Sequence, residues 1–134
     1  MRRLLPACAI ILSGCSGGAD LAYAENGIAR FHDELNAGQF NRIYSEASPE
    51  WKQASPEADT VQLFTAIHSK LGAFVSGKQN GWRVNYGTDG TTIFVEYDSK
   101  FEKGPGLETF NYRRTAKGAQ LVGYNINSRA LITG

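Results

Sequence analysis

The apolar residues of this 134-residue chain change their spacing near Gly72, and this change limits the fold more than any other feature of the sequence. Before Gly72, apolar residues recur every three or four positions, the spacing of one face of a helix. After Gly72, they alternate with polar residues, the pattern of strands that bury one face. A chain with helices first and strands second is expected to fold as an α+β domain.

Two helical stripes precede the change. The first contains Ala24, Ile28, Phe31 and Leu35, and the second contains Thr60, Phe64, Ile67 and Leu71. Gly38 and Gly72 follow the stripes, where a left-handed glycine ends a helix. A shorter helix is expected at 40–47. Ser48-Pro49-Glu50 and Ser55-Pro56-Glu57 each predict a helix start, because serine caps, proline fits the first turn and glutamate complements the dipole.

Four segments after Gly72 alternate between apolar and polar residues, at about 82–86, 91–101, 110–112 and 122–126. They are separated by Thr88-Asp89-Gly90, Gly104-Pro105-Gly106 and Lys117-Gly118, which predict turns or loops. Connections this short require antiparallel neighbours. We therefore predict N-terminal helices packed on one face of a four-stranded antiparallel meander sheet.

The alternation also assigns the two faces of the predicted sheet. The apolar alternates should face the helices, and they are Trp82, Val84, Tyr86, Ile93, Val95, Tyr97, Phe110, Tyr112, Val122, Tyr124 and Ile126. Arg83, Glu96, Asp98 and Arg113 should share the opposite, solvated face.

Several short motifs of the chain resemble those of small bacterial envelope proteins of unknown function. They are residues 34–40 (ELNAGQF), Tyr44, Ala47-Ser48, Lys70-Leu71-Gly72 and residues 122–126 (VGYNI). The resemblance implies a cystatin-like or nuclear-transport-factor-2-like (NTF2-like) cone, in which a bent sheet wraps around a long helix. It carries over no catalytic position, because this group of proteins has no agreed function.

The N-terminus has the pattern of an export signal. Arg2 and Arg3 precede an apolar run from Leu4 to Leu12 that is too short to span a bilayer, which needs about 20 residues. Leu12-Ser13-Gly14-Cys15 then resembles the lipobox of bacterial lipoproteins. The resemblance implies cleavage before Cys15, a diacylglycerol thioether on its sulfur, and an acyl chain such as palmitate on its amino group.

These features predict three segments: a lipoprotein signal peptide at 1–14, a lipidated tether at 15–20 and a single domain at 21–134. The alternative is a secreted protein with a free N-terminal thiol. By resemblance to the sorting rule of Gram-negative lipoproteins, Ser16 after the cysteine favours the outer membrane, facing the periplasm. Cys8 is lost with the signal, so the mature chain has neither a disulfide nor a thiol nucleophile.

Charge and motif spacing exclude several function classes. The formal net charge is +1, and it stays close to zero after cleavage, so no nucleic-acid partner is expected. No His-x₃-His, His-Glu-x-x-His or glycine-rich phosphate motif occurs, so we expect no metal and no cofactor. His32 and His68 are interpreted as boundary or surface residues.

The candidate site residues come from the predicted inward face. Its large aromatic residues could line a ligand pocket or form the core, and they are Trp82, Tyr86, Tyr97, Tyr112 and Tyr124. Glu108 lies on the same predicted face, and it is the one carboxylate that the predicted strands place there. It could be a pocket acid of the kind that isomerases and dehydratases of the same cone fold use, but its place near a strand end favours a rim residue.

Three functions follow from these observations. The favoured one is a non-catalytic, membrane-anchored envelope lipoprotein that binds a partner protein or a small ligand. The alternative is a scaffold or assembly factor for an envelope complex. A proton-transfer enzyme of the cone fold, built on Glu108, is the least favoured, because fold analogy alone does not establish catalysis.

Overall fold

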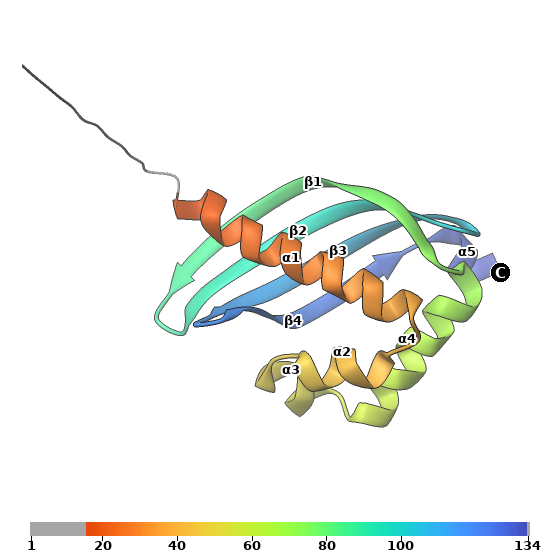
Figure 1. The fold of residues 1–134 in the computed structure, drawn as a ribbon, viewed down its shortest axis with the longest axis horizontal. Helices are drawn as coiled ribbons and strands as arrows, with labels where there is room; N and C mark the ends of the chain where they lie inside the picture. The colour runs from red at the N-terminus through yellow and green to blue at the C-terminus, as the bar shows by residue number, and fades with distance from the viewer. Residues whose placement is uncertain (1–15, 134) are drawn as a thin grey trace, which may run out of the picture.

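The structure is a computed structural model that describes residues 16–133 (Figure 1). Its helices are α1 (Ser16–Asn36), α2 (Phe40–Glu46), α3 (Pro49–Ala54), α4 (Glu57–Leu71) and α5 (Arg129–Thr133). Its strands are β1 (Phe74–Gly87), β2 (Gly90–Phe101), β3 (Gly104–Thr115) and β4 (Gly118–Asn127). The predicted signal peptide at 1–14 and Cys15 lie outside the described residues.

The strands form one antiparallel meander sheet in the order β1-β2-β3-β4, which confirms the predicted α+β class. The sheet bends around α1, which crosses its inner face along the strands (Figure 1). Helices α2 and α3 lie beside the β4 edge, and α4 follows at the end of α1 (Figure 1). Helices α1 to α4 therefore lie on the inner side of the sheet, and none of these four covers its other, open face (Figure 1).

The core consists of the predicted stripes of α1 and α4, single residues of α2 and α3, and inward strand residues. Leu35, Phe64, Ile93, Val95 and Phe110 are fully buried. Burial of each such side chain contributes about 1.5–3 kcal/mol relative to leaving it exposed. The apolar residues of the helices before Gly72 therefore pack against those of the strands after it.

Both ends of α1 are fixed to the sheet by polar side chains. Near its start, Asp20 accepts a hydrogen bond from Arg114 Nε at 2.9 Å. At its end, the Asn36 side-chain amide forms two hydrogen bonds with the backbone of Phe74, at 3.0 and 2.8 Å. These contacts set the position of α1 along the strands.

The first turns of α1 differ from the sequence prediction of a short polar tether at 15–20. Residues 16–20 are helical and belong to α1. Gly17 lies against Trp82, and Asp20 pairs with Arg114. Contacts with the sheet, which local composition does not reveal, stabilise these small residues as helix.

The two serine-proline motifs behave differently. Ser48 caps α3 by accepting a hydrogen bond from the backbone N–H of Trp51, as predicted. The prediction for Ser55 was wrong, because Pro56 occupies the N-cap position of α4 and gives no side-chain cap. The Ser55 hydroxyl instead lies 3.2 Å from that of Thr60.

A bulge alters the predicted face of β4. The register shifts between Asn111 and Tyr112 of β3, so Tyr112 pairs with Leu121. Leu121 is therefore buried, while Val122, expected to face the helices, is half-buried. A single extra residue in one strand reverses the facing of the residues beyond it.

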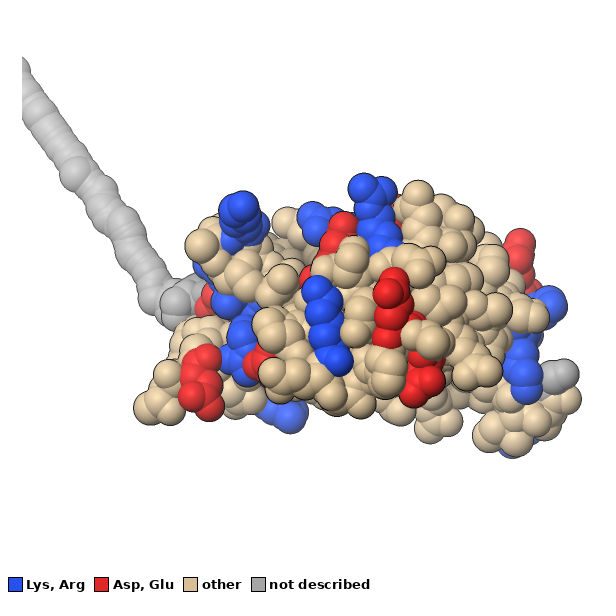
Figure 2. Space-filling view, turned by 90° about the horizontal axis from the view of Figure 1, so that it is seen from below, with Lys and Arg blue, Asp and Glu red and all other residues tan. Residues whose placement is uncertain are grey.

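The surface carries both signs of charge. In the view from below, basic and acidic side chains are interspersed and most of the face is uncharged (Figure 2). Within residues 16–133, no helix combines the length and apolar character needed to cross a membrane.

Two glycines of α1 allow a matched test of how closely this helix packs. A Cβ on Gly27 would lie 2.8 Å from the ring of the buried Tyr112, whereas Gly18 has nothing within 4 Å. We expect Gly27→Ala to lower the free energy of unfolding by about 1–3 kcal/mol through overpacking. Gly18→Ala should raise it by up to about 1 kcal/mol through helix propensity. Urea unfolding measures both, and equal stabilisation by the two changes would contradict the packing of α1.

Candidate functional site

Glu108 of β3 lies at the centre of a buried polar cluster. Its inward side chain follows from the strand alternation that also buries Phe110 and Tyr112. The residue is 0% exposed, so the expectation that it occupies the rim was wrong. The bend of the sheet and the cover of α1 place this end of β3 deep in the molecule.

Three side chains from three other elements bind the Glu108 carboxylate. His32 Nε2 of α1 lies 2.7 Å from Oε1, and the Ser99 hydroxyl of β2 donates to the same oxygen at 2.6 Å. The Tyr124 hydroxyl of β4 donates to Oε2 at 2.5 Å. With its proton on Nε2, His32 completes a set of three donors. This cluster, Glu108, His32, Ser99 and Tyr124, joins α1 to three adjacent strands.

Phe74 covers the cluster at the start of β1. Its ring stacks on His32 with centroids 3.5 Å apart and planes 4° apart. The two Asn36 hydrogen bonds hold the backbone of Phe74 in this position. The cluster is therefore closed by the same contact that fixes the end of α1.

Burial, with a smaller effect of the Glu108 carboxylate, raises the pKa values of the tyrosines around the cluster. Burial, followed by the negative charge of Glu108, raises the pKa of Tyr112 and of Tyr124 well above the ordinary value. Burial also raises the pKa of Tyr97, with smaller effects from Glu25 and Glu108. These tyrosines stay neutral, so Tyr124 remains a hydrogen-bond donor.

The structure brings together three of the five aromatic residues predicted to line a pocket. Tyr97 and Tyr124 contact Phe110 edge-on and tilted, respectively, and Tyr112 stacks on the same ring. Trp82 and Tyr86 instead lie near the start of α1, 42% and 61% exposed. The five therefore do not line one common pocket, and the three inner rings pack as core.

The interpretation of His32 as a boundary residue was wrong, since it is 4% exposed. It lies three residues before Leu35 and four after Ile28, so helical spacing places it at the edge of the buried stripe. That spacing could have revealed its burial, but not its partner 76 positions away. His68 is half-buried, with its ring against the edge of Phe40.

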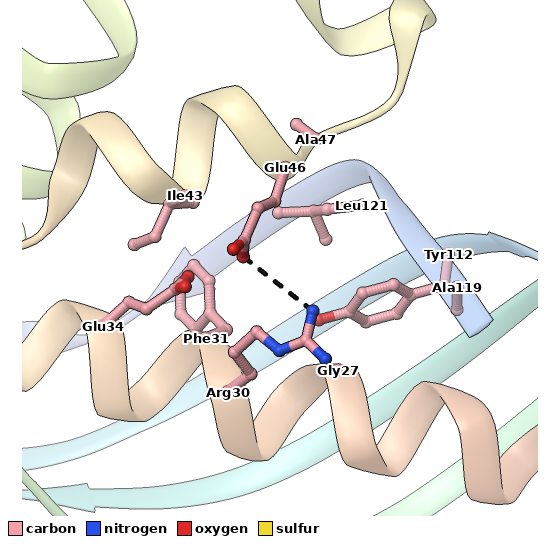
Figure 3. A pocket seen from close by; sticks show the side chains of 10 residues that line it. All are labelled: Gly27, Arg30, Phe31, Glu34, Ile43, Glu46, Ala47, Tyr112, Ala119 and Leu121. Carbon is pink, nitrogen blue, oxygen red and sulfur yellow. Dashed lines mark ion pairs between the residues drawn. The ribbon is translucent and has the colours of Figure 1, made fainter. Parts of the chain in front are cut away.

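A second candidate site is a small cavity of about 40 Å³ where α1 and α2 meet strands β3 and β4 (Figure 3). Its lining is Gly27, Arg30, Phe31, Glu34, Ile43, Glu46, Ala47, Tyr112, Ala119 and Leu121. Arg30 and Glu46 form an ion pair of 3.9 Å across its mouth. A cavity of this size holds only a few water molecules.

Two carboxyl groups meet in this cavity. Burial is the main cause that raises the pKa of Glu34 to about 7, and hydrogen bonding and charge repulsion from Glu46 add to it. Arg30 and Arg42 lower the pKa by smaller amounts. The pair resembles two carboxylates that share one proton. Within residues 16–133, no group of three or more His, Cys, Asp or Glu could hold a metal.

The comparison with solved structures finds the same architecture. The chain is similar to the crystal structure of an NTF2-like family protein from Streptomyces avermitilis that is named as a putative dehydratase, with a TM-score of 0.53 and 12% identity. The match covers 81% of this chain and 95% of that chain. This chain has an NTF2-like fold.

The NTF2-like fold confirms the cone predicted from the sequence, and at this identity the likeness concerns the fold alone. No family model matches the sequence. No curated protein matches it either. The chemistry of the NTF2-like domain therefore depends on its own residues.

Titration of Glu34 should make stability depend on pH. Between its ordinary pKa of 4.5 and about 7, the folded state holds a proton that the unfolded state releases. The free energy of unfolding should therefore fall as pH rises through this interval. Urea unfolding at several pH values measures the slope, which Glu34→Gln should reduce and Glu25→Gln, on the exposed side of α1, should not. The same slope in Glu34→Gln would contradict the shared proton.

Removal of one donor should test the Glu108 cluster. Tyr124→Phe leaves Oε2 of a buried carboxylate without its partner, so we expect a loss of about 1.5–3 kcal/mol in the free energy of unfolding. Tyr44→Phe is the matched control, because half-buried Tyr44 lies outside the cluster. A similar small change in both variants would show that the Tyr124 hydroxyl contributes no net stability.

Proposed function

We propose that this NTF2-like domain is a non-catalytic binding module of the bacterial envelope, held on a membrane by a lipid at Cys15. The observation that carries the proposal is the structural role of the Glu108 carboxylate. The carboxylate is fully buried and bound by His32, Ser99 and Tyr124. A carboxylate whose oxygens already bind three internal donors is suited to stabilise the fold rather than to move a substrate proton.

The interior supports this proposal. The rings of Phe31, Phe64, Phe110 and Tyr124 lie with centroids 4.9–5.6 Å apart in edge-on and tilted contacts. Such distances are those of packed aromatic cores. A ligand of ordinary size would have to displace these rings, so binding is assigned to the outside of the domain.

The membrane location rests on the sequence. Leu12-Ser13-Gly14-Cys15 resembles the lipobox, and Ser16 favours the outer membrane of a Gram-negative host. Helix α1 begins at Ser16, directly after the proposed lipid. The domain would then stand close to the membrane that holds it, with another envelope protein or a small ligand as partner.

A second candidate function is proton transfer by His32 and Glu108. Their 2.7 Å contact is that of an acid–base pair, and the similar NTF2-like protein carries the name of a dehydratase. This function requires a route from solvent to the cluster, past Phe74 or past the half-buried Tyr124. The two functions therefore differ in whether small molecules reach Glu108.

Chemical labelling distinguishes them. A water-soluble carbodiimide with glycine methyl ester modifies carboxyl groups that small molecules can reach, and peptide mass spectrometry locates the products. We expect exposed Glu57 to be labelled in the folded protein, and Glu108 only after unfolding, because the latter is enclosed. Labelling of Glu108 at the rate of Glu57 in the folded protein would favour proton transfer and contradict the proposed function.

The lipid anchor is tested on protein from its own host. Intact mass should show loss of residues 1–14 and the addition of a diacylglycerol and acyl chain at Cys15. The Cys15→Ser variant should retain the first fourteen residues and carry no lipid, because it has no sulfur at position 15 for the lipid to attach to. An unmodified Cys15 in the native protein would remove the membrane from the proposal.

A further inference from the structure

The open face of the sheet contains a hollow of about 740 Å³. It extends over all four strands near the β2–β3 turn and reaches the start of α5. Two other surface hollows measure about 580 and 380 Å³. Because Tyr97 and Glu108 point inward, their neighbours Asp98 and Leu107 point outward and line this hollow.

Three cationic side chains line the hollow, and they come from different elements. Lys78 lies on β1, Lys100 on β2 and Arg129 at the start of α5. Asp98 is the single carboxylate of the lining and lies opposite Lys78 in the register. The hollow therefore has two positive charges in excess in a protein whose overall charge is nearly balanced.

These cations have no partner in the described part of the chain. Among residues 16–133, no carboxylate lies within 4 Å of the charged groups of Lys78, Lys100 or Arg129. By contrast, Arg113 pairs with Glu50 at 2.6 Å and Arg114 with Asp20 at 2.9 Å. The fold uses those arginines internally and leaves the three cations of the hollow available.

The rest of the lining fits a peptide better than a single small anion. Pro105 and Leu107 form an apolar middle, and Ser76 and Asn127 provide polar groups on the outer strands. Strands about 4.8 Å apart give a width of about 14 Å across the sheet. Cations on both sides of an apolar centre are complementary to a peptide in which acidic residues flank an apolar residue.

The hollow also lies far from the proposed anchor. It is at the end of the sheet where Asn36 binds Phe74, whereas Asp20 marks the opposite end. The 21 residues of α1 separate the two ends by about 31 Å. A lipid-anchored domain would present this hollow at a distance from its attachment point.

We propose that the hollow lined by Lys78, Lys100 and Arg129 binds an acidic segment of another protein. The inference rests on the proposed function, because it names the surface and partner chemistry of the binding module. The three cations attract acidic side chains, Leu107 and Pro105 accept an apolar side chain between them, and Asp98 disfavours additional acidic groups at its position.

Fluorescence anisotropy with a fluorescein-labelled peptide of alternating Glu and Leu tests the proposal, with a Gln-Leu peptide as the uncharged control. We expect binding of the Glu peptide alone, weakened by added salt. The double change Lys78→Glu and Lys100→Glu should weaken it about tenfold or more, and Arg129→Glu should weaken it separately. Lys117→Glu, at the opposite end of the sheet, is the matched control and should have no effect.

Other outcomes overturn the inference. They are absence of peptide binding, equal binding of both peptides, or equal weakening by Lys117→Glu. Binding of phosphatidylglycerol vesicles or inorganic phosphate through the same lysines, without the peptide, would replace the peptide with a lipid or phosphate ligand. If the hollow binds nothing while Glu108 resists labelling in the folded protein, this inference fails and the proposed function stands.

Discussion

The burial of one carboxylate, Glu108, is the constraint on which the rest of this structure depends. A buried charge is costly unless hydrogen bonds replace its water, and here the donors come from α1, β2 and β4. The helix can satisfy the carboxylate only at one height along the strands, where His32 meets β3. The polar cluster therefore fixes the position of α1 along the strands. Apolar packing alone would allow the helix to shift along the sheet more easily.

The contacts at both ends of α1 reinforce this position. Asp20 binds Arg114 at one end, and Asn36 holds Phe74 over His32 at the other. Because all of these groups lie on the inner face, the helices and the inner half of the sheet form one closed unit. The open face of the sheet takes no part in these contacts, and it contains the hollow that we propose as a binding surface.

Much of the fold could be predicted from the sequence, because spacing reports burial directly. Local pattern predicted three features: the buried stripe through Ile28 and Leu35, the positive-φ glycines after α1 and α4, and the order of helices and strands. The Glu108 cluster did not, since the pairing of His32 with a residue 76 positions away depends on how the helix lies on the sheet. The bulge at Val122 and the helical start at Ser16 likewise arise from tertiary contacts.

The most direct test of the closed cluster is the exchange of the His32 ring proton with water, followed by NMR. The account predicts a proton on Nε2, shifted downfield by its bond to Glu108, that exchanges only through large-scale opening of the fold. A ring proton on Nδ1 alone, or an Nε2 proton that exchanges with water within milliseconds in the folded protein, would contradict it. The first result would mean that His32 accepts the hydrogen bond and that Glu108 holds the proton. The second would mean that solvent reaches the cluster in the folded protein.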